Sequence, residues 1–206
     1  MSAGSGLLTK QSNRRGETHA PIRYLISPRG SLLALGRMKR HLDLMRDQSA
    51  EFPSVADPLS YESARVWHCK YSTLSPLAQF DNLRSLEVAT YPDETFAPLA
   101  ALRNLERLSI THLPRIRSLL ELCGLSQLRE LHLATLPSWD SSGQVTTVES
   151  LVPLAQLPRL ERLELFGVVT SSRSADDLLA SISLKDVKLS KYAADSMDRV
   201  RQRYAA

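Results

Sequence analysis

Leucines recur in the middle of the chain in a fixed pattern: leucine, two variable residues, leucine, one variable residue and an aliphatic residue. Four segments carry it: Leu83/Leu86/Val88, Leu105/Leu108/Ile110, Leu128/Leu131/Leu133 and Leu160/Leu163/Leu165. Their first positions are separated by 22, 23 and 32 residues. Apolar residues at three-residue steps precede each segment, as Leu74, Leu77 and Phe80 precede Leu83. A period in this range predicts an array of stacked structural repeats.

The same register extends in weaker form toward both ends of the chain. Steps of 22 residues backward and of 24 residues forward reach Tyr61/Ala64/Val66, Lys39/Leu42/Leu44 and Leu184/Val187/Leu189. About seven units therefore fit residues 39–191, four of them strong. Degenerate end units are expected, because a terminal repeat closes the core instead of continuing it.

Each unit predicts one coil of a solenoid. Its alternating part is typical of a short strand whose leucines point inward while the residues between them point outward. The apolar residues at three-residue steps predict a helical or 3₁₀ return, and the prolines at 76, 98 and 153 suit its first turn. Because no coil buries its leucines alone, the coils must stack. The predicted fold is an α/β solenoid with a parallel sheet on its concave face and short helices or 3₁₀ turns on its convex face.

Residues 39–191, about three quarters of the chain, resemble the bacterial or cytosolic leucine-rich-repeat proteins of the 22-residue class. That family places Asn or Cys three residues after the last strand leucine, to bond the backbone of the turn. This position here holds Tyr91, Leu113, Leu136, Val168 and Tyr192, with Cys69 in the second unit. The asparagine ladder is absent, so we expect apolar side chains in that layer and backbone or water partners for the turn amides. The resemblance implies an interaction module, without naming its partner.

The remaining segments are expected to close the array. We expect a disordered basic tail at 1–19, an N-terminal cap at 20–38 and a C-terminal capping helix at 192–206. Residues 31–47 fit both a cap helix and the beginning of the first repeat. The spacing of the last segment puts four apolar side chains on one face of a helix: Ala193, Met197, Val200 and Tyr204.

An insertion at 137–150 makes the 32-residue unit longer than the others. It follows a predicted strand, beside the rim of the concave face, and contains Trp139 in a stretch rich in serine. Insertions in such arrays form loops on one face, often the binding face. Trp139 is therefore either an exposed contact residue or a residue that packs back on the solenoid.

The residues between the strand leucines are predicted to line the concave face. They mix both signs of charge with small residues and two aromatic side chains. Arginine and tryptophan dominate many protein interfaces, so the candidate partner-binding residues, with the insertion included, are Arg65, Trp67, Glu87, Arg107, His132, Trp139, Arg162, Glu164 and Phe166. The alternative is that cross-strand pairs, such as Arg65 with Glu87 and Arg162 with Glu130, simply satisfy one another.

The net charge of +4 comes from the N-terminal quarter of the chain. Residues 1–48 contain nine Lys or Arg against three acidic residues, a net of +6, and the remainder nets −2. A basic segment suits nucleic acid or an acidic partner. The mixed charges of the predicted face argue against a nucleic-acid groove, which needs a basic stripe, and against a membrane face.

Compartment and chemistry are indicated mainly by absent motifs. The chain has no apolar run of bilayer length, its first 17 residues lack the apolar region of a signal peptide, and two cysteines suit a reducing cytosol. We therefore expect a cytoplasmic protein. The five histidines lack metal-pair spacing, and no phosphate loop, dinucleotide fingerprint or nucleophile elbow occurs. These observations predict no metal, no cofactor and no enzymatic activity.

The sequence thus predicts a non-enzymatic scaffold that binds a protein partner on its concave face. An inhibitor or immunity-type protein is the narrower form of this prediction. The alternative is a nucleic-acid-associated protein that uses the basic N-terminal quarter.

Overall fold

The computed structural model describes residues 40–204, so the expected tail at 1–19 and cap at 20–38 lie outside the described residues. The strands are β1 (Arg40–Met45), β2 (Tyr61–Trp67), β3 (Ser85–Ala89), β4 (Arg107–Thr111), β5 (Glu130–Ala134), β6 (Thr146–Val148), β7 (Arg162–Phe166), β8 (Val168–Thr170) and β9 (Asp186–Leu189). The helices are α1 (Pro137–Ser141), α2 (Val152–Ala155) and α3 (Ala194–Tyr204), with the 3₁₀ turns η1 (Pro58–Ser60), η2 (Ser75–Gln79), η3 (Ala97–Leu99), η4 (Leu120–Gly124) and η5 (Asp176–Ala180).

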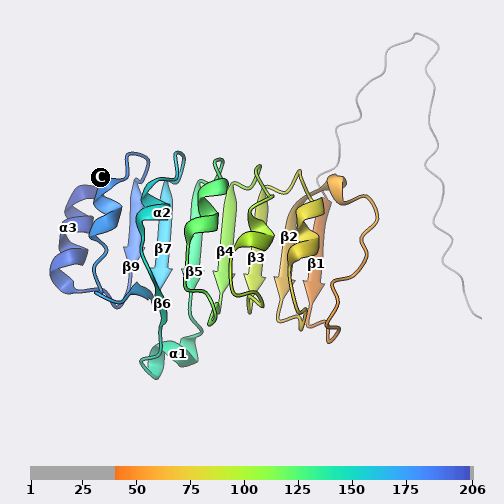
Figure 1. The fold of residues 1–206 in the computed structure, drawn as a ribbon, viewed down its shortest axis with the longest axis horizontal. Coiled ribbons are helices and arrows are strands. Elements are labelled where there is room, and N and C mark those ends of the chain that lie inside the picture. The colour runs from red at the N-terminus through yellow and green to blue at the C-terminus, as the bar shows by residue number, and fades with distance from the viewer. Residues whose placement is uncertain (1–39, 205–206) are drawn as a thin grey trace, which may run out of the picture. The chain divides into compact units, whose positions relative to one another are not determined.

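Seven strands form one parallel sheet in the order β1-β2-β3-β4-β5-β7-β9, seen as a row of arrows in Figure 1. Parallel neighbours arise because each strand is followed by a return that brings the chain back to the same end of the sheet. The register joins one central column across all seven strands: Asp43, Arg65, Glu87, Ser109, His132, Glu164 and Lys188. This confirms the predicted register, and β1 shows that the ambiguous segment 31–47 contributes the first strand.

The returns cover one face of the sheet, and leucines from both layers form a continuous core. In the middle of the array Leu99, Leu105 and Ile110 are all 0% exposed. Proline occupies the first or second position of η1, η2, η3 and α2, where its missing N–H has no helical partner to lose. Each buried leucine contributes about 2 kcal/mol of transfer free energy, so the core is the main stabilising feature of the stack.

The layer that lacks the asparagine ladder is filled by apolar side chains, as expected. Tyr91, Leu113 and Val168 are at most 1% exposed. The turn amides find backbone partners in the next coil, as His112 N donates to Ala134 O at 2.7 Å. These bonds continue the hydrogen bonding of the sheet past the strand ends, which makes a side-chain ladder unnecessary.

The residue directly after a strand adopts a left-handed backbone in five coils. These residues are Arg46, His68, Thr90, His112 and Gly167, with φ between 52° and 71°. Left-handed φ is uncommon for residues other than glycine and is strained for a β-branched one such as Thr90. Because only one of the five is glycine, the sequence gives no sign of this repeated turn.

A polar ladder does exist, but at the opposite edge of the sheet from the family's position. The side-chain amide of Asn82 donates to Leu59 O at 2.6 Å, and that of Asn104 donates to Asp81 O at 2.7 Å. In the last coil Ser183 Oγ donates to Leu157 O at 2.8 Å. Each bond ties the segment before one strand to the backbone of the previous coil, a function that sequence reasoning missed.

A second row along this edge alternates in charge from coil to coil. Its members are Glu62, Arg84, Glu106, Arg129, Glu161 and Lys185. Arg84 pairs with Glu106, and Glu161 accepts from Arg129 at 2.9 Å and from Lys185 at 3.1 Å. Lys185, and then Arg129, hold the pKa of Glu161 below its ordinary value. Exposed pairs of this kind add little stability individually, but each of these three contacts joins opposite charges of adjacent coils and so favours correct stacking.

The insertion forms structure of its own at the C-terminal ends of the strands. Helix α1 follows β5 and lies beyond that end of the sheet (Figure 1). Strand β6 then pairs with β8 in a separate two-stranded parallel sheet. Thr146 anchors this segment, because its backbone N donates to Gly167 O at 2.9 Å and its hydroxyl donates to Leu113 O at 3.3 Å. Sequence reasoning expected a loop here and did not predict the small sheet.

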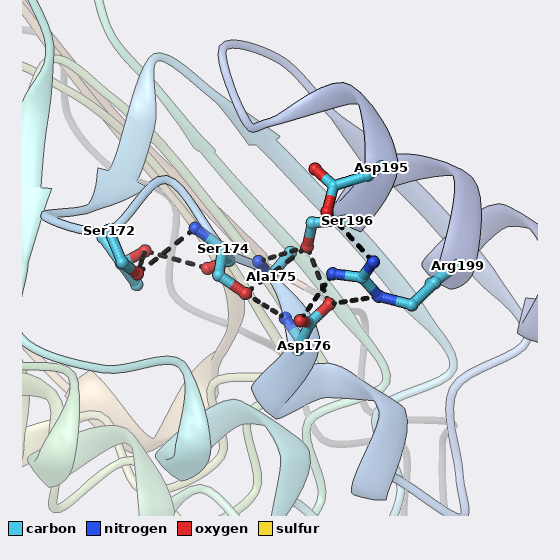
Figure 2. Close-up of polar contacts among 8 residues, drawn as sticks. Ser172, Ser174, Ala175, Asp176, Asp195, Ser196 and Arg199 are labelled. Carbon is cyan, nitrogen blue, oxygen red and sulfur yellow. Dashed lines mark hydrogen bonds and ion pairs between the residues drawn. The ribbon is translucent and has the colours of Figure 1, made fainter.

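Helix α3 is joined to η5 by the polar network drawn in Figure 2. Ser196 Oγ accepts a hydrogen bond from Ala175 N at 2.8 Å and donates to Asp176 Oδ1 at 2.9 Å. Arg199 Nη2 donates to Asp176 Oδ2 at 2.7 Å and lowers the pKa of that carboxyl. On the same helix Val200 is 1% exposed and belongs to the core. Helix α3 therefore packs on the last coil through both polar and apolar contacts.

We expect Ser196→Ala to lower the free energy of unfolding by about 1–3 kcal/mol, because the buried amide of Ala175 loses its acceptor. Urea denaturation followed by circular dichroism measures this loss. Ser183→Ala is the matched control, since Ser183 Oγ donates to Leu157 O and lies 3.4 Å from Ser181 Oγ but accepts from no backbone amide of the described residues. Equal losses in the two variants would contradict the role given to Ser196.

Candidate functional site

The face of the seven-stranded sheet that points away from the core carries the candidate residues. We call it the sheet face, and it consists of the outward residues of β1, β2, β3, β4, β5, β7 and β9. A groove of about 470 Å³ lies on it. Its polar lining comes from Ser85, Glu87, Arg107, Ser109, Glu130, His132, Arg162, Glu164, Asp186 and Lys188. The groove includes five of the nine predicted partner-binding residues, all on strands of the solenoid.

Arg65 is engaged within the sheet face, but not by the partner that the sequence suggested. Its Nε and Nη2 donate to the two carboxylate oxygens of Asp43 at 2.9 and 2.8 Å. This fork-shaped contact is the ion pair of Arg65, whereas Glu87, the partner that the sequence suggested, acts on Arg65 only through its charge at longer range. The Arg65 guanidinium lowers the pKa of Asp43 through these bonds. The planar guanidinium matches a carboxylate best when both oxygens are accessible, as they are at Asp43.

Arg162 and Glu130 form the other pair that the sequence suggested. Arg162 Nη1 donates to Glu130 Oε1 at 2.9 Å, between adjacent strands β7 and β5. Both side chains remain partly exposed, so the pair contributes little net stability. Its main effect is to neutralise two charges within the groove.

Glu164 connects two more candidates in the central column. Its Oε1 accepts from Lys188 Nζ at 2.7 Å, and its Oε2 lies 2.9 Å from His132 Nδ1. The Lys188 ammonium, and then the His132 ring, keep the pKa of Glu164 below its ordinary value. The His132 ring also contacts Phe166, with 5.7 Å between the centroids. These four side chains therefore form one connected group on β5, β7 and β9.

Glu87 and Arg107 differ from their neighbours on the sheet face. Neither forms an ion pair or a side-chain hydrogen bond with any residue of the described part of the chain. Arg107 is exposed on β4, the middle strand of the seven, and Glu87 is half-buried on the adjacent β3. Glu87 acts on Arg65 only through its charge, at longer range. Two opposite charges without a direct ion pair therefore lie on adjacent strands of the groove, two residues apart in register.

The aromatic candidates lie at the C-terminal edge of the sheet face. Trp67 and Phe166 are half-buried at the ends of β2 and β7. Trp67 contacts the ring of His68, with centroids 5.5 Å apart. Trp139 belongs to α1 and packs edge-on against His112, with centroids 5.0 Å apart and an interplanar angle of 85°. In this structure the insertion thus packs back on the solenoid through its tryptophan.

Residues 40–204 contain no group of three His, Cys, Asp or Glu side chains arranged to hold a metal ion. Cys69 is buried and donates its thiol to Leu44 O at 3.4 Å, while Cys123 is half-buried with a pKa raised by burial. Within the same range, none of the helices is both long enough and apolar enough to span a bilayer.

The chain was compared with known proteins. No protein-family model and no curated protein matches it. It is similar to the solved structure of internalin C2 from Listeria monocytogenes, at 24% identity and a TM-score of 0.42, over 62% of this chain and 52% of that one. It is also similar to an internalin, InlF, from the same organism, at 19% identity and a TM-score of 0.46, over 72% of this chain and 47% of that one.

The chain therefore spans about half the length of these two structures. The arrangement of its strands and core defines the architecture. Successive coils each contribute one strand to a parallel sheet of seven, and the leucines of strands and returns form one core. Residues 40–204 are a leucine-rich-repeat solenoid.

Proposed function

We propose that the chain is a non-enzymatic protein-binding module that docks its partner on the sheet face. The observation that carries this proposal is the pair Glu87 and Arg107. Most charges around them form direct ion pairs within the face, whereas these two form none, and Glu87 acts on Arg65 only at longer range. A partner that presents a carboxylate to Arg107 and a cation to Glu87 complements both.

The arrangement of charge supports a protein partner over a nucleic acid. Along the central column acidic residues alternate with basic and neutral ones, as Asp43, Arg65 and Glu87 do. Phosphate backbones need a run of positive charge, and the carboxylates in the groove would repel them. A folded protein surface, in contrast, supplies both signs at side-chain spacing.

A few residues of the sheet face should contribute most of the binding free energy. Arginine and aromatic side chains account for a large share of interface hot spots, especially near the centre of the contact. Arg107 meets this description by its position on the middle strand, with Trp67 and Phe166 at the edge. Arg65 and Arg162 should matter less, because a partner must compete with their existing carboxylates.

Two narrower points belong to the same proposal. A module that closes one surface of a single partner would act as an inhibitor or immunity-type protein, and a face of mixed charge suits such one-to-one recognition. A cytoplasmic location is compatible with a free buried thiol at Cys69.

A photo-crosslinking residue placed at Ser109 tests where the partner docks. Ser109 lies half-buried and uncharged in the groove, between Glu87 and His132. The same crosslinker at Leu120, 64% exposed on η4, is the matched control on the opposite face. A product formed from Ser109 and lost on adding Arg107→Glu supports the proposal. A product formed only from Leu120 places the partner on the returns and overturns it.

Arg107→Glu is expected to raise the Kd for the partner by roughly 30-fold. This corresponds to a loss of about 2 kcal/mol of binding free energy, as at an interface hot spot. Isothermal titration calorimetry with the purified partner measures the change in Kd. Arg103→Glu is the control, because it makes the same change of charge at an exposed position before β4. Equal weakening by both variants would mean that net charge, and not the groove, determines binding.

A further inference from the structure

Trp139 on α1 contacts His112, which follows β4 in the body of the solenoid. The two rings meet edge to face at 5.0 Å. The hydroxyls of Ser141 and Ser142 in the same segment bond only to backbone carbonyls of α1 itself, at Ser138 and Trp139. The ring contact therefore joins α1 to the solenoid, whereas the hydroxyls of these two serines do not.

His112 is held in an environment that suits only a neutral ring. It follows β4 at φ 68°, and its backbone N donates to Ala134 O. Its Nδ1 is buried and has no hydrogen-bond partner among the described residues. A proton on this atom would place a charge where no acceptor compensates it, which is costly in a buried position.

The backbone neighbours of His112 carry no negative charge at ordinary pH. Its N donates to Ala134 O, and its O accepts from Tyr91 N. From the insertion it meets the uncharged indole of Trp139. The titratable group that acts on it is His68, after β2, whose own charge disfavours a second one.

We propose that His112 makes the insertion pH-sensitive: the neutral ring holds Trp139, and protonation of the ring releases Trp139 and α1. The proposal does not depend on the proposed function. Motion should be confined to the stretch between Leu136 and Thr146, because the backbone and hydroxyl of Thr146 remain bonded to the solenoid. Release would expose an indole beyond the C-terminal ends of the strands, where α1 lies (Figure 1).

The direction of the pH effect follows from the burial of His112. Burial, and then the charge of His68, lower the pKa of His112 below its ordinary value of 6.5. When Trp139 is released (the open form), His112 binds a proton more readily than when Trp139 packs on it (the closed form). The closed insertion is thus fully stable above pH 6.5 and loses stability as pH falls through the lower pKa of the closed state.

Trp139 fluorescence tests the proposal directly in the full-length chain. The chain has two tryptophans, so Trp67→Phe leaves Trp139 as the single reporter. Between pH 8 and pH 4.5 we expect a red shift of the emission maximum with a midpoint below 6.5, while far-UV circular dichroism stays constant. His112→Phe keeps an aromatic ring that cannot be protonated and should abolish the shift. His112→Gln, with no ring, should give the red-shifted emission at every pH.

The control and the contradicting results are equally specific. His68→Gln should retain the transition and move its midpoint upward, because the competing charge is removed. Emission that does not change with pH, or a transition that persists in His112→Phe, would overturn the proposal. A blue shift with a midpoint above 6.5 would also overturn it, since it would mean that a cation–π contact strengthens on protonation.

Discussion

Gly167→Ala is expected to lower the free energy of unfolding by roughly 3 kcal/mol. Gly167 follows β7 at φ 68°, where a residue with a Cβ pays about 1–2 kcal/mol. An added Cβ would lie 2.2 Å from Thr135 Oγ1 and 3.1 Å from its Cγ2. Thr135 is buried in the neighbouring coil, so backbone or side chain must shift at a cost of about 1–3 kcal/mol. Urea denaturation followed by circular dichroism gives the loss.

Gly143→Ala separates the two causes. Gly143 also has positive φ, at 76°, but nothing lies within 4 Å of an added Cβ. Gly143→Ala should lower the free energy of unfolding by about 1 kcal/mol, which is the cost of the left-handed backbone without a collision. Adding Thr135→Ala to Gly167→Ala removes the colliding atoms and should restore part of the stability relative to Thr135→Ala alone. If both glycine variants lose the same unfolding free energy, and Thr135→Ala restores none of it, then the contact of the added Cβ with Thr135 does not affect stability.

Leu133→Ala should cost about 3–5 kcal/mol. Leu133 lies in β5 and is 0% exposed, and its register neighbours Ile110 and Leu165 are 0% exposed as well. These neighbours belong to adjacent strands fixed by backbone hydrogen bonds, so the cavity left by the substitution cannot collapse. The midpoint of urea denaturation, with an unchanged m-value, measures this loss.

Leu44→Ala is the matched substitution at the end of the same column. Leu44 pairs in register with Val66 but belongs to the edge strand β1, where it is only half-buried. The cost should be less than half of that at Leu133, because less apolar surface is lost from the core. Equal costs at the two positions would contradict the model of a core that weakens toward its N-terminal strand.

The register of the sheet could be predicted because each strand repeats the same alternation. Leu86, Leu108 and Leu131 identify one inward position in three successive coils, and the outward residues follow from it. Parallel pairing without a slip then places every outward residue in its column. A one-residue error would have turned all leucines toward solvent.

The choice of ion-pair partner could not be predicted in the same way. Arg65 has an acidic residue on each side, Asp43 on β1 and Glu87 on β3, both at the same strand spacing. The rotamer that gives a two-oxygen contact selects Asp43. That choice leaves Glu87 without a direct ion pair, so the candidate site depends on a side-chain rotamer that a sequence pattern does not specify.

The insertion escaped prediction for a related reason. Strand β6 has three residues, too few for alternation to show, and it pairs with β8, which directly follows β7 after Gly167. Trp139 packs on His112, whose left-handed backbone could not be expected from a residue that is not glycine. The sequence around Trp139 and His112 shows only their residue types, and the stacking of the coils brings them together.

The alternating charges at the beginning of the strands limit how many coils can be removed without bringing like charges together. Deletion of one coil, residues 84–105, would place Glu62 beside Glu106, so two like charges would face each other across the new junction. Deletion of two coils, residues 84–128, would place Glu62 beside Arg129 and restore attraction. The electrostatic period of this solenoid is therefore twice its structural period, and coils are best added or removed in pairs.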